Sequence, residues 1–128
     1  MKVISPLAVY LPRKTMKDKR ISLNLNVYMH LNHFAINQAR SVYFELMGSQ
    51  LRSLRFNRVE LVFWLFKGSK RKIDRANFLS IIEKFFCDAL VHHGVIKDDS
   101  DDYVLKTTYA TRGIDPKNPR VEIEIIEI

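Results

Sequence analysis

The hydrophobic residues of this chain change their spacing several times, and these changes limit the folds that it can adopt. The segments in which they alternate with polar residues or form a short apolar run, as in β-strands, are 2–10, 21–30, 58–66, 102–110 and 120–128. Over 33–54 and 75–93 they recur every three or four residues, as on one face of an amphipathic helix. The sequence therefore predicts the order β-β-α-β-α-β-β.

This order predicts a small α+β domain that spans residues 1–128, with a mixed, mostly antiparallel sheet and two helices packed on one face. A chain of 128 residues, of which 47% are hydrophobic, suits one core. The basic segment 12–20 is expected to be a loop or a hairpin arm, and Gly94 is expected to end the second helix.

The cysteine count and the hydropathy pattern indicate a compartment. Cys87 is the only cysteine, so an internal disulfide is excluded and a reducing cytosol is expected. No apolar run reaches the length of a membrane-spanning helix, so no membrane partner is expected.

A net charge of +7 favours a polyanionic partner such as nucleic acid, because cations that neutralise phosphates release counterions. The positive residues form two clusters: Lys14, Lys17, Lys19 and Arg20 in the first, and Lys67, Lys70, Arg71, Lys72 and Arg75 in the second. We expect the second cluster to contact DNA phosphates; a solvated basic loop is the alternative.

The second helical segment carries a polar stripe beside its apolar face. At about 100° per residue, Asp74, Asn77, Lys84 and Asp88 all fall along one side of the helix. Such a stripe is suited to binding an ion or moving a proton. The simpler alternative is that Asp74 is a helix N-cap and that Lys84 and Asp88 form an ordinary surface pair.

Four acids follow this helix at 98–102, in the sequence D-D-S-D-D. A returning chain would bring Asp98 or Asp99 toward the polar stripe. Two or three oxygen ligands from separate elements, with open water positions, are what Mg²⁺ accepts. A solvated acidic turn is the alternative interpretation.

Three short motifs are similar to those of a known family, and from Lys84 through Asp88-Ala89-Leu90 and Gly94 to Asp98-Asp99 the order and the spacing both agree. They are D-R-A-N at 74–77, E-K-F-F-C-D-A-L-V at 83–91 and G-V-I-K-D-D at 94–99, with weaker support from S-L-N-L-N-V-Y at 22–28. Over about 74–104 the chain resembles the RusA family of phage and prophage Holliday junction resolvases.

The resemblance implies a homodimeric endodeoxyribonuclease that acts on branched DNA in the cytoplasm of a bacterial host, in DNA recombination and repair. It would cut two opposed strands of a four-way junction with Mg²⁺, or Mn²⁺ as a substitute, and with no small-molecule cofactor. It assigns catalysis to Asp74, Asp99 and Lys84, and metal binding to Asp74, Asp99, Asp98 and Asn77. It implies DNA contact for Asn24, beside the second basic cluster, and for Asp88 a role that is as much structural as chemical.

The chain departs from the family pattern at two places. Ala76 stands where the family has a second acid, and a methyl group does not bind a metal. Asn77 and Lys84 are seven positions apart, which is four more than the family pattern; four residues are about one helical turn, so both stay on one face. The loss of the acid keeps a second hypothesis open: a catalytically impaired junction-binding or DNA-binding protein on the same scaffold.

Overall fold

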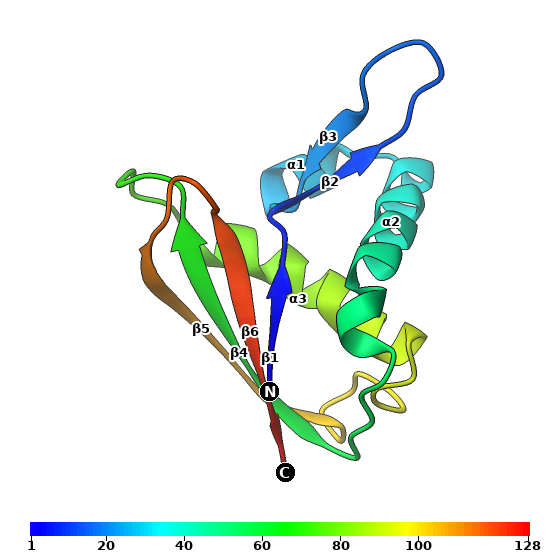
Figure 1. Cartoon of the computed structure of the whole chain (residues 1–128), viewed down its shortest axis with the longest axis vertical. Helices are drawn as coiled ribbons and strands as arrows, with labels where there is room; N and C mark the ends of the chain where they lie inside the picture. Colours follow the sequence, from blue (N-terminus) through cyan, green and yellow to red (C-terminus); the bar gives the residue numbers. More distant parts are fainter.

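The computed structural model describes all residues, Met1–Ile128, and its main elements follow the predicted order (Figure 1). In chain order the elements are β1 (Lys2–Ser5), β2 (Ala8–Leu11), β3 (Lys19–Ser22), α1 (Leu25–His30), α2 (His33–Leu51), β4 (Val59–Lys67), α3 (Arg75–His92), β5 (Val104–Ile114) and β6 (Arg120–Glu127). The α+β class and the mostly antiparallel sheet are confirmed.

The main sheet has the strand order β1-β6-β4-β5. Its central strand, β4, pairs antiparallel with β6, where Phe63 faces Ile123, and parallel with β5, where Phe63 faces Tyr109. Side chains along β4 alternate between the two faces of the sheet. Those on the helix-covered face are fully buried: Val59, Leu61, Phe63 and Leu65.

Helix α3 crosses the covered face and begins and ends at well-defined caps. Asp74 is its N-cap, and the side chain of this residue accepts a hydrogen bond from the backbone of Ala76. At the other end the N–H of Val95 donates to the carbonyl of Leu90 at 2.8 Å, and Gly94 adopts a positive φ of 70°. These are features of a Schellman motif, so the predicted stop at Gly94 is confirmed.

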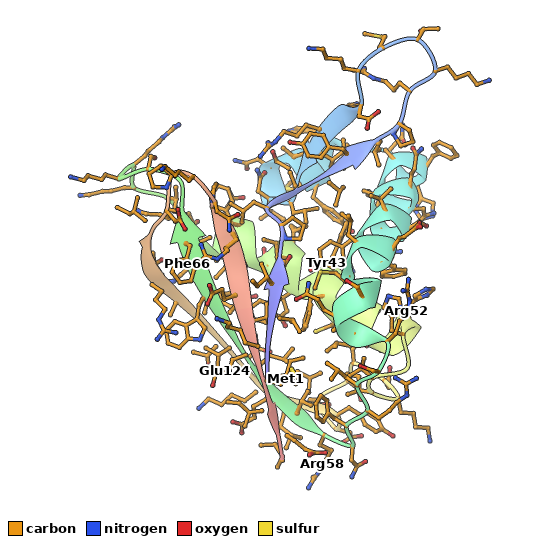
Figure 2. The ribbon with its side chains drawn as sticks, in the orientation of Figure 1. Met1, Tyr43, Arg52, Arg58, Phe66 and Glu124 are labelled. Atoms are coloured by element: carbon orange, nitrogen blue, oxygen red, sulfur yellow. The ribbon has the colours of Figure 1, made fainter.

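One core of 26 buried residues joins the sheet, the helices and the β2–β3 hairpin. Tyr43 of α2 points into it, as Figure 2 shows, and packs edge-on against Phe85 with ring centroids 5.7 Å apart. Its hydroxyl shares a hydrogen bond of 2.8 Å with the hydroxyl of Ser5, so the buried polar groups of both residues are satisfied.

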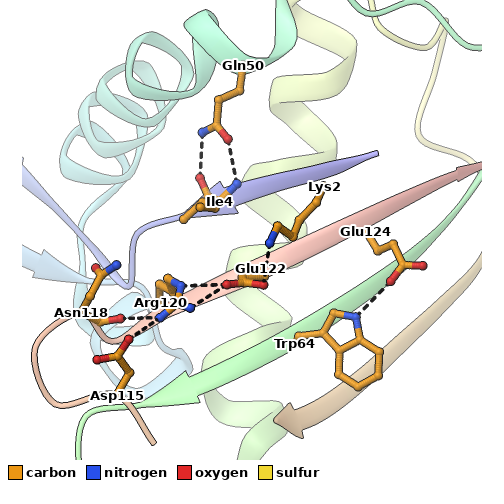
Figure 3. A network of polar contacts seen from close by, with 9 residues as sticks. All are labelled: Lys2, Ile4, Gln50, Trp64, Asp115, Asn118, Arg120, Glu122 and Glu124. Carbon is orange, nitrogen blue, oxygen red and sulfur yellow. Dashed lines mark hydrogen bonds and ion pairs between the residues drawn. The ribbon is translucent and has the colours of Figure 1, made fainter. Parts of the chain in front are cut away.

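The opposite face of the sheet carries a network of polar side chains instead of a helix layer (Figure 3). Glu122 lies between Lys2, at 3.3 Å, and Arg120, at 2.6 Å. The indole N–H of Trp64 donates to Glu124 at 3.3 Å. At the edge of the sheet, the amide of Gln50 accepts from the N–H of Ile4 and donates to its carbonyl oxygen.

Two of the predicted strand segments differ from the structure. The segment 2–10 forms two short strands, β1 and β2, which are separated at Pro6 and belong to different sheets. The prediction of one strand over 21–30 is wrong: β3 ends at Ser22, and α1 follows because the side chain of Asn24 accepts a hydrogen bond from the N–H of Val27 at 2.9 Å.

Candidate functional site

The second basic cluster runs from the last residue of β4, through the connecting loop, to the first residue of α3, and it lies beside a pocket. This pocket of about 530 Å³ lies between the loop, α1 and the first turn of α3. Predicted site residues that line it are Asn24, Lys67, Arg71, Lys72, Asp74 and Asn77. The structure therefore brings Asp74 and Asn77 together with three of the predicted DNA-binding cations.

Asp74 is an exposed carboxylate that one hydrogen bond fixes in place. Its Oδ1 accepts from the N–H of Ala76 at 3.1 Å, so the N-cap interpretation is confirmed. The carboxylate has further lone pairs, because a hydrogen bond to one oxygen uses only part of its acceptor capacity. It also lies at the positive end of the α3 dipole, which favours negative charge at this place.

The loop that carries the cations is held by its own hydrogen bonds. Lys67 donates from Nζ to the carbonyl of Arg71 at 3.0 Å, and the N–H of Arg71 donates to the hydroxyl of Ser69 at 3.3 Å. Beyond Asp74, Arg75 donates to the hydroxyl of Thr111 on β5 at 3.2 Å. Lys70 is exposed on the same loop, outside the pocket. The cations thus surround Asp74 from two sides.

A second cluster of predicted residues lies at the other end of α3. Lys84, Asp88 and Asp99 line a surface hollow of about 460 Å³ together with Arg40 and His92. Asp88 forms an ion pair with Arg40 of α2 at 3.1 Å, and both side chains are 29% exposed. The alternative interpretation, a surface pair between Lys84 and Asp88, is therefore wrong. Asp88 pairs with Arg40 of α2 instead.

The two clusters are far apart within one chain. From Asp74 to Asp88 there are 14 positions of helix, and a rise of about 1.5 Å per residue makes about 21 Å. The strand pairing leads to the same conclusion. Asp74 follows the end of β4 and Asp99 precedes the start of β5. Because these two strands are parallel, with Val59 paired to Val104, the two acids lie at opposite ends of the sheet. One chain therefore does not bring Asp74 and Asp99 to one metal ion.

The remaining predicted ligands do not complete a second metal group. Asp98 is exposed next to Asp99, and no set of three His, Cys, Asp or Glu side chains lies close enough together to hold a metal ion. Among the predicted metal ligands, the carboxylate of Asp74 and the amide of Asn77 line the same pocket.

Sequence reasoning missed two residues that hold side chains of α3. Arg40 forms an ion pair with Asp88. The spacing of residues along either helix does not predict this pair, because it joins two helices that are far apart in the chain. Tyr109 of β5 donates a hydrogen bond to Glu83, on the opposite side of α3 from the polar stripe. Burial, followed by this carboxylate neighbour, raises the pKa of the Tyr109 hydroxyl above its usual value.

These features define a small, basic α+β protein with a cationic pocket at the N-terminal end of its central helix. No protein-family model matches the chain, and no curated protein matches it. None of its helices is long and apolar enough to cross a lipid bilayer. The resemblance to the RusA family rests on the motifs at 74–104 and stays a prediction.

Proposed function

We propose that this protein is a metal-dependent, structure-selective endonuclease that acts on branched DNA. The observation that carries the proposal is the pocket in which Asp74 and Asn77 lie among Lys67, Arg71 and Lys72. A carboxylate that shares a pocket with three cations suits a phosphodiester substrate: the cations hold the phosphates, and the carboxylate and amide supply oxygen ligands for a metal ion.

The donor set in this pocket fits Mg²⁺ in chemistry and in number. Mg²⁺ is commonly held by one or two carboxylates together with substrate phosphates and water, and Asp74 and Asn77 would hold it here. When bound, the ion supplies charge neutralisation at the phosphate and lowers the pKa of a coordinated water. The chain itself positions the phosphate with the loop cations and keeps Asp74 oriented through the Ala76 N–H.

Asp99 and Lys84 take part in this proposal through a second copy of the chain. Lys84 lies ten positions along α3 from Asp74, about 15 Å away, Asp99 lies beyond it past the end of α3, and both side chains are exposed. In a two-fold symmetric dimer that sets α3 antiparallel to its copy, the end of α3 beside which Asp99 lies in one chain would face the end that begins at Asp74 in the other. The Lys84 ammonium would then stabilise negative charge that develops on the phosphate.

Ala76 favours a second candidate function, a protein that binds DNA junctions without cutting them. The pocket contains one carboxylate, because the position that would supply another carries a methyl group. Binding through the loop cations does not depend on that acid, so it would survive a loss of catalysis.

The test uses an end-labelled four-way junction and a linear duplex of matched sequence, in Mg²⁺, Mn²⁺ and EDTA. We expect paired nicks on the junction alone, none in EDTA, and none with the Asp74→Asn protein, which should still bind the junction. Glu127→Gln, a substitution at an exposed acid on β6, is the matched control and should cut normally. Tight binding without cutting in either metal would establish the second candidate instead.

A further inference from the structure

The first basic cluster, which the family resemblance leaves unassigned, lies on the β2–β3 hairpin. The two strands pair from Ala8 with Ser22 to Leu11 with Lys19, so residues 12–18 form the connecting loop. Inward-facing side chains of the stem are buried in the core: Val9, Leu11 and Ile21. A stem that is anchored in this way holds its loop in a fixed direction, away from the rest of the molecule (Figure 1).

The hairpin carries a net positive charge that no ion pair in the structure neutralises. Residues 12–20 are all exposed and contain five cations, Arg13, Lys14, Lys17, Lys19 and Arg20, against one acid, Asp18. None of the ion pairs of the structure involves these residues. Figure 2 shows the side chains of the loop extending into solvent. This surface is suited to a polyanion.

The loop also has an internal brace and an apolar tip. Arg13 donates from Nε to the carbonyl of Lys17 at 2.8 Å, which closes the loop around its middle residues. Met16 lies within the closed segment, between Lys14 and Lys17, and 64% of its surface is exposed. An unbranched, apolar side chain flanked by two lysines can reach unstacked bases while its neighbours contact phosphates.

The hairpin and the pocket are connected through α1. Asn24 lies two residues after the end of β3, and its backbone N–H donates to the carbonyl of Ser22. The same residue lines the pocket that contains Asp74. Figure 1 shows the hairpin and the β4–α3 loop toward the same end of the molecule, with α1 between them in this view. One DNA molecule can therefore contact both basic elements.

We propose that the β2–β3 hairpin is a second DNA-binding arm, which contacts backbone phosphates through Lys14 and Lys17 and places Met16 against unstacked bases at a branch point. This inference rests on the proposed function and deepens it, because it assigns the selectivity for branched DNA to an element outside the pocket. Branch points expose base faces that continuous duplex hides, and an apolar side chain distinguishes the two.

The first experiment measures DNA binding in EDTA, so that it does not depend on cleavage. We compare wild type with the double variant Lys14→Gln/Lys17→Gln over a range of salt concentrations. The slope of log K against log salt should fall by about two, since each phosphate contact contributes about 0.9. The control is Arg58→Gln/Lys106→Gln, which removes the same charge from exposed positions near the start of β4, at the other end of this strand from the β4–α3 loop, and should leave the slope within about 0.5 of wild type.

The second experiment tests Met16 with a four-way junction that carries 2-aminopurine beside the branch point. Wild type should increase the fluorescence, because the base leaves its stack, and Met16→Ala should remove most of the increase while its affinity for linear duplex stays unchanged. Met29→Ala, at another exposed methionine, is the matched control and should behave as wild type.

The outcomes of these experiments distinguish a failure of the hairpin inference from a failure of the proposed nuclease function. An unchanged salt slope in the hairpin variant would overturn the inference and leave the pocket proposal standing. Hairpin-dependent binding by a protein that cuts nothing would support the arm and contradict catalysis. If wild type binds no DNA but binds vesicles of anionic phospholipid, both proposals are overturned.

Discussion

At the scale of single residues, Asp74 and Asp88 show how one residue type serves different purposes on one helix. Asp74 is exposed, caps α3 and lies in a cationic pocket, so part of its acceptor capacity stays available. Asp88 is engaged with Arg40 at 3.1 Å, where both side chains are mostly shielded from water. Asp74 is therefore suited to binding a metal ion, whereas Asp88 joins α2 to α3.

We expect Asp88→Ala to lower the free energy of unfolding by about 1 kcal/mol, because it leaves the Arg40 guanidinium half-buried without its partner. Chemical denaturation measures this loss, with Asp98→Ala, at an exposed acid without an ion pair, as the control. A protein with unchanged stability and no cleavage would instead place Asp88 in the reaction.

Cys87 should react slowly with a thiol reagent while the protein is folded. Burial, and then the nearby carboxylates of Glu83, Asp99 and Asp88, raise the pKa of its thiol from 9.0 to about 12. At pH 8 the thiolate fraction is then roughly a thousandfold lower than in the unfolded chain. Reaction with a disulfide reagent, followed with and without denaturant, measures the ratio; equal rates would contradict it.

The same pKa shift has a consequence for stability. The folded state keeps the Cys87 proton above pH 9.0, where the unfolded chain loses it, so rising pH favours the unfolded state. Unfolding curves should therefore show a loss of stability between pH 9 and pH 10 that is smaller in Cys87→Ala.

At the scale of elements, α3 decides how the site is divided. Its 18 residues run from the cationic pocket to the cluster around Asp99, and the cap at each end fixes where those clusters lie. The polar residues of α3 share one side of the helix, but those near its start line the cationic pocket and those farther along line the hollow around Asp99. A single amphipathic helix thus carries two partial sites instead of one.

The C-terminal end of α3 depends on the conformation of Gly94. We expect Gly94→Ala to lower the free energy of unfolding by about 1–2 kcal/mol, because a Cβ is strained at a φ of 70° even though the nearest side-chain atom, on Arg55, would be 3.9 Å away. Gly68→Ala is the control: its φ is not positive, the new Cβ would meet Pro119 at 3.5 Å, and the expected change is under about 0.5 kcal/mol. Thermal unfolding of both variants measures the difference.

At the scale of the whole molecule, the parallel pairing of β4 with β5 places the two catalytic acids of the proposal at opposite ends of the sheet. Asp74 follows the end of one strand, and Asp99 precedes the start of the next. If both act on one phosphate, they come from two copies of the chain. This requirement connects the proposed activity to the proposed dimer.

Mixing two inactive proteins tests this requirement. A dimer of one Asp74→Asn chain and one Asp99→Asn chain would have one intact site if the acids meet across the interface, and no intact site if they act within one chain. We therefore expect the mixture, after refolding together, to nick one strand of the junction, while each variant alone cuts nothing. A mixture without activity would contradict the shared site, and a doubly substituted chain refolded with wild type provides the control for exchange.

The sequence by itself determined the order of elements, the central strand, the extent of α3 and its stop at Gly94, because hydrophobic period and cap chemistry are local properties. It failed at 21–30, where alternation predicts a strand but the Asn24 side chain starts a helix, and at Pro6, which divides the first strand.

The residue types of the candidate site could also be predicted from the sequence, but their grouping could not. Asp74 joins Asn77 and the loop cations, while Asp88 joins Arg40 and Asp99 lies at the far end of α3. Only the tertiary structure decided this, because the distance between two side chains depends on strand order and helix direction, which residue spacing along the chain does not contain.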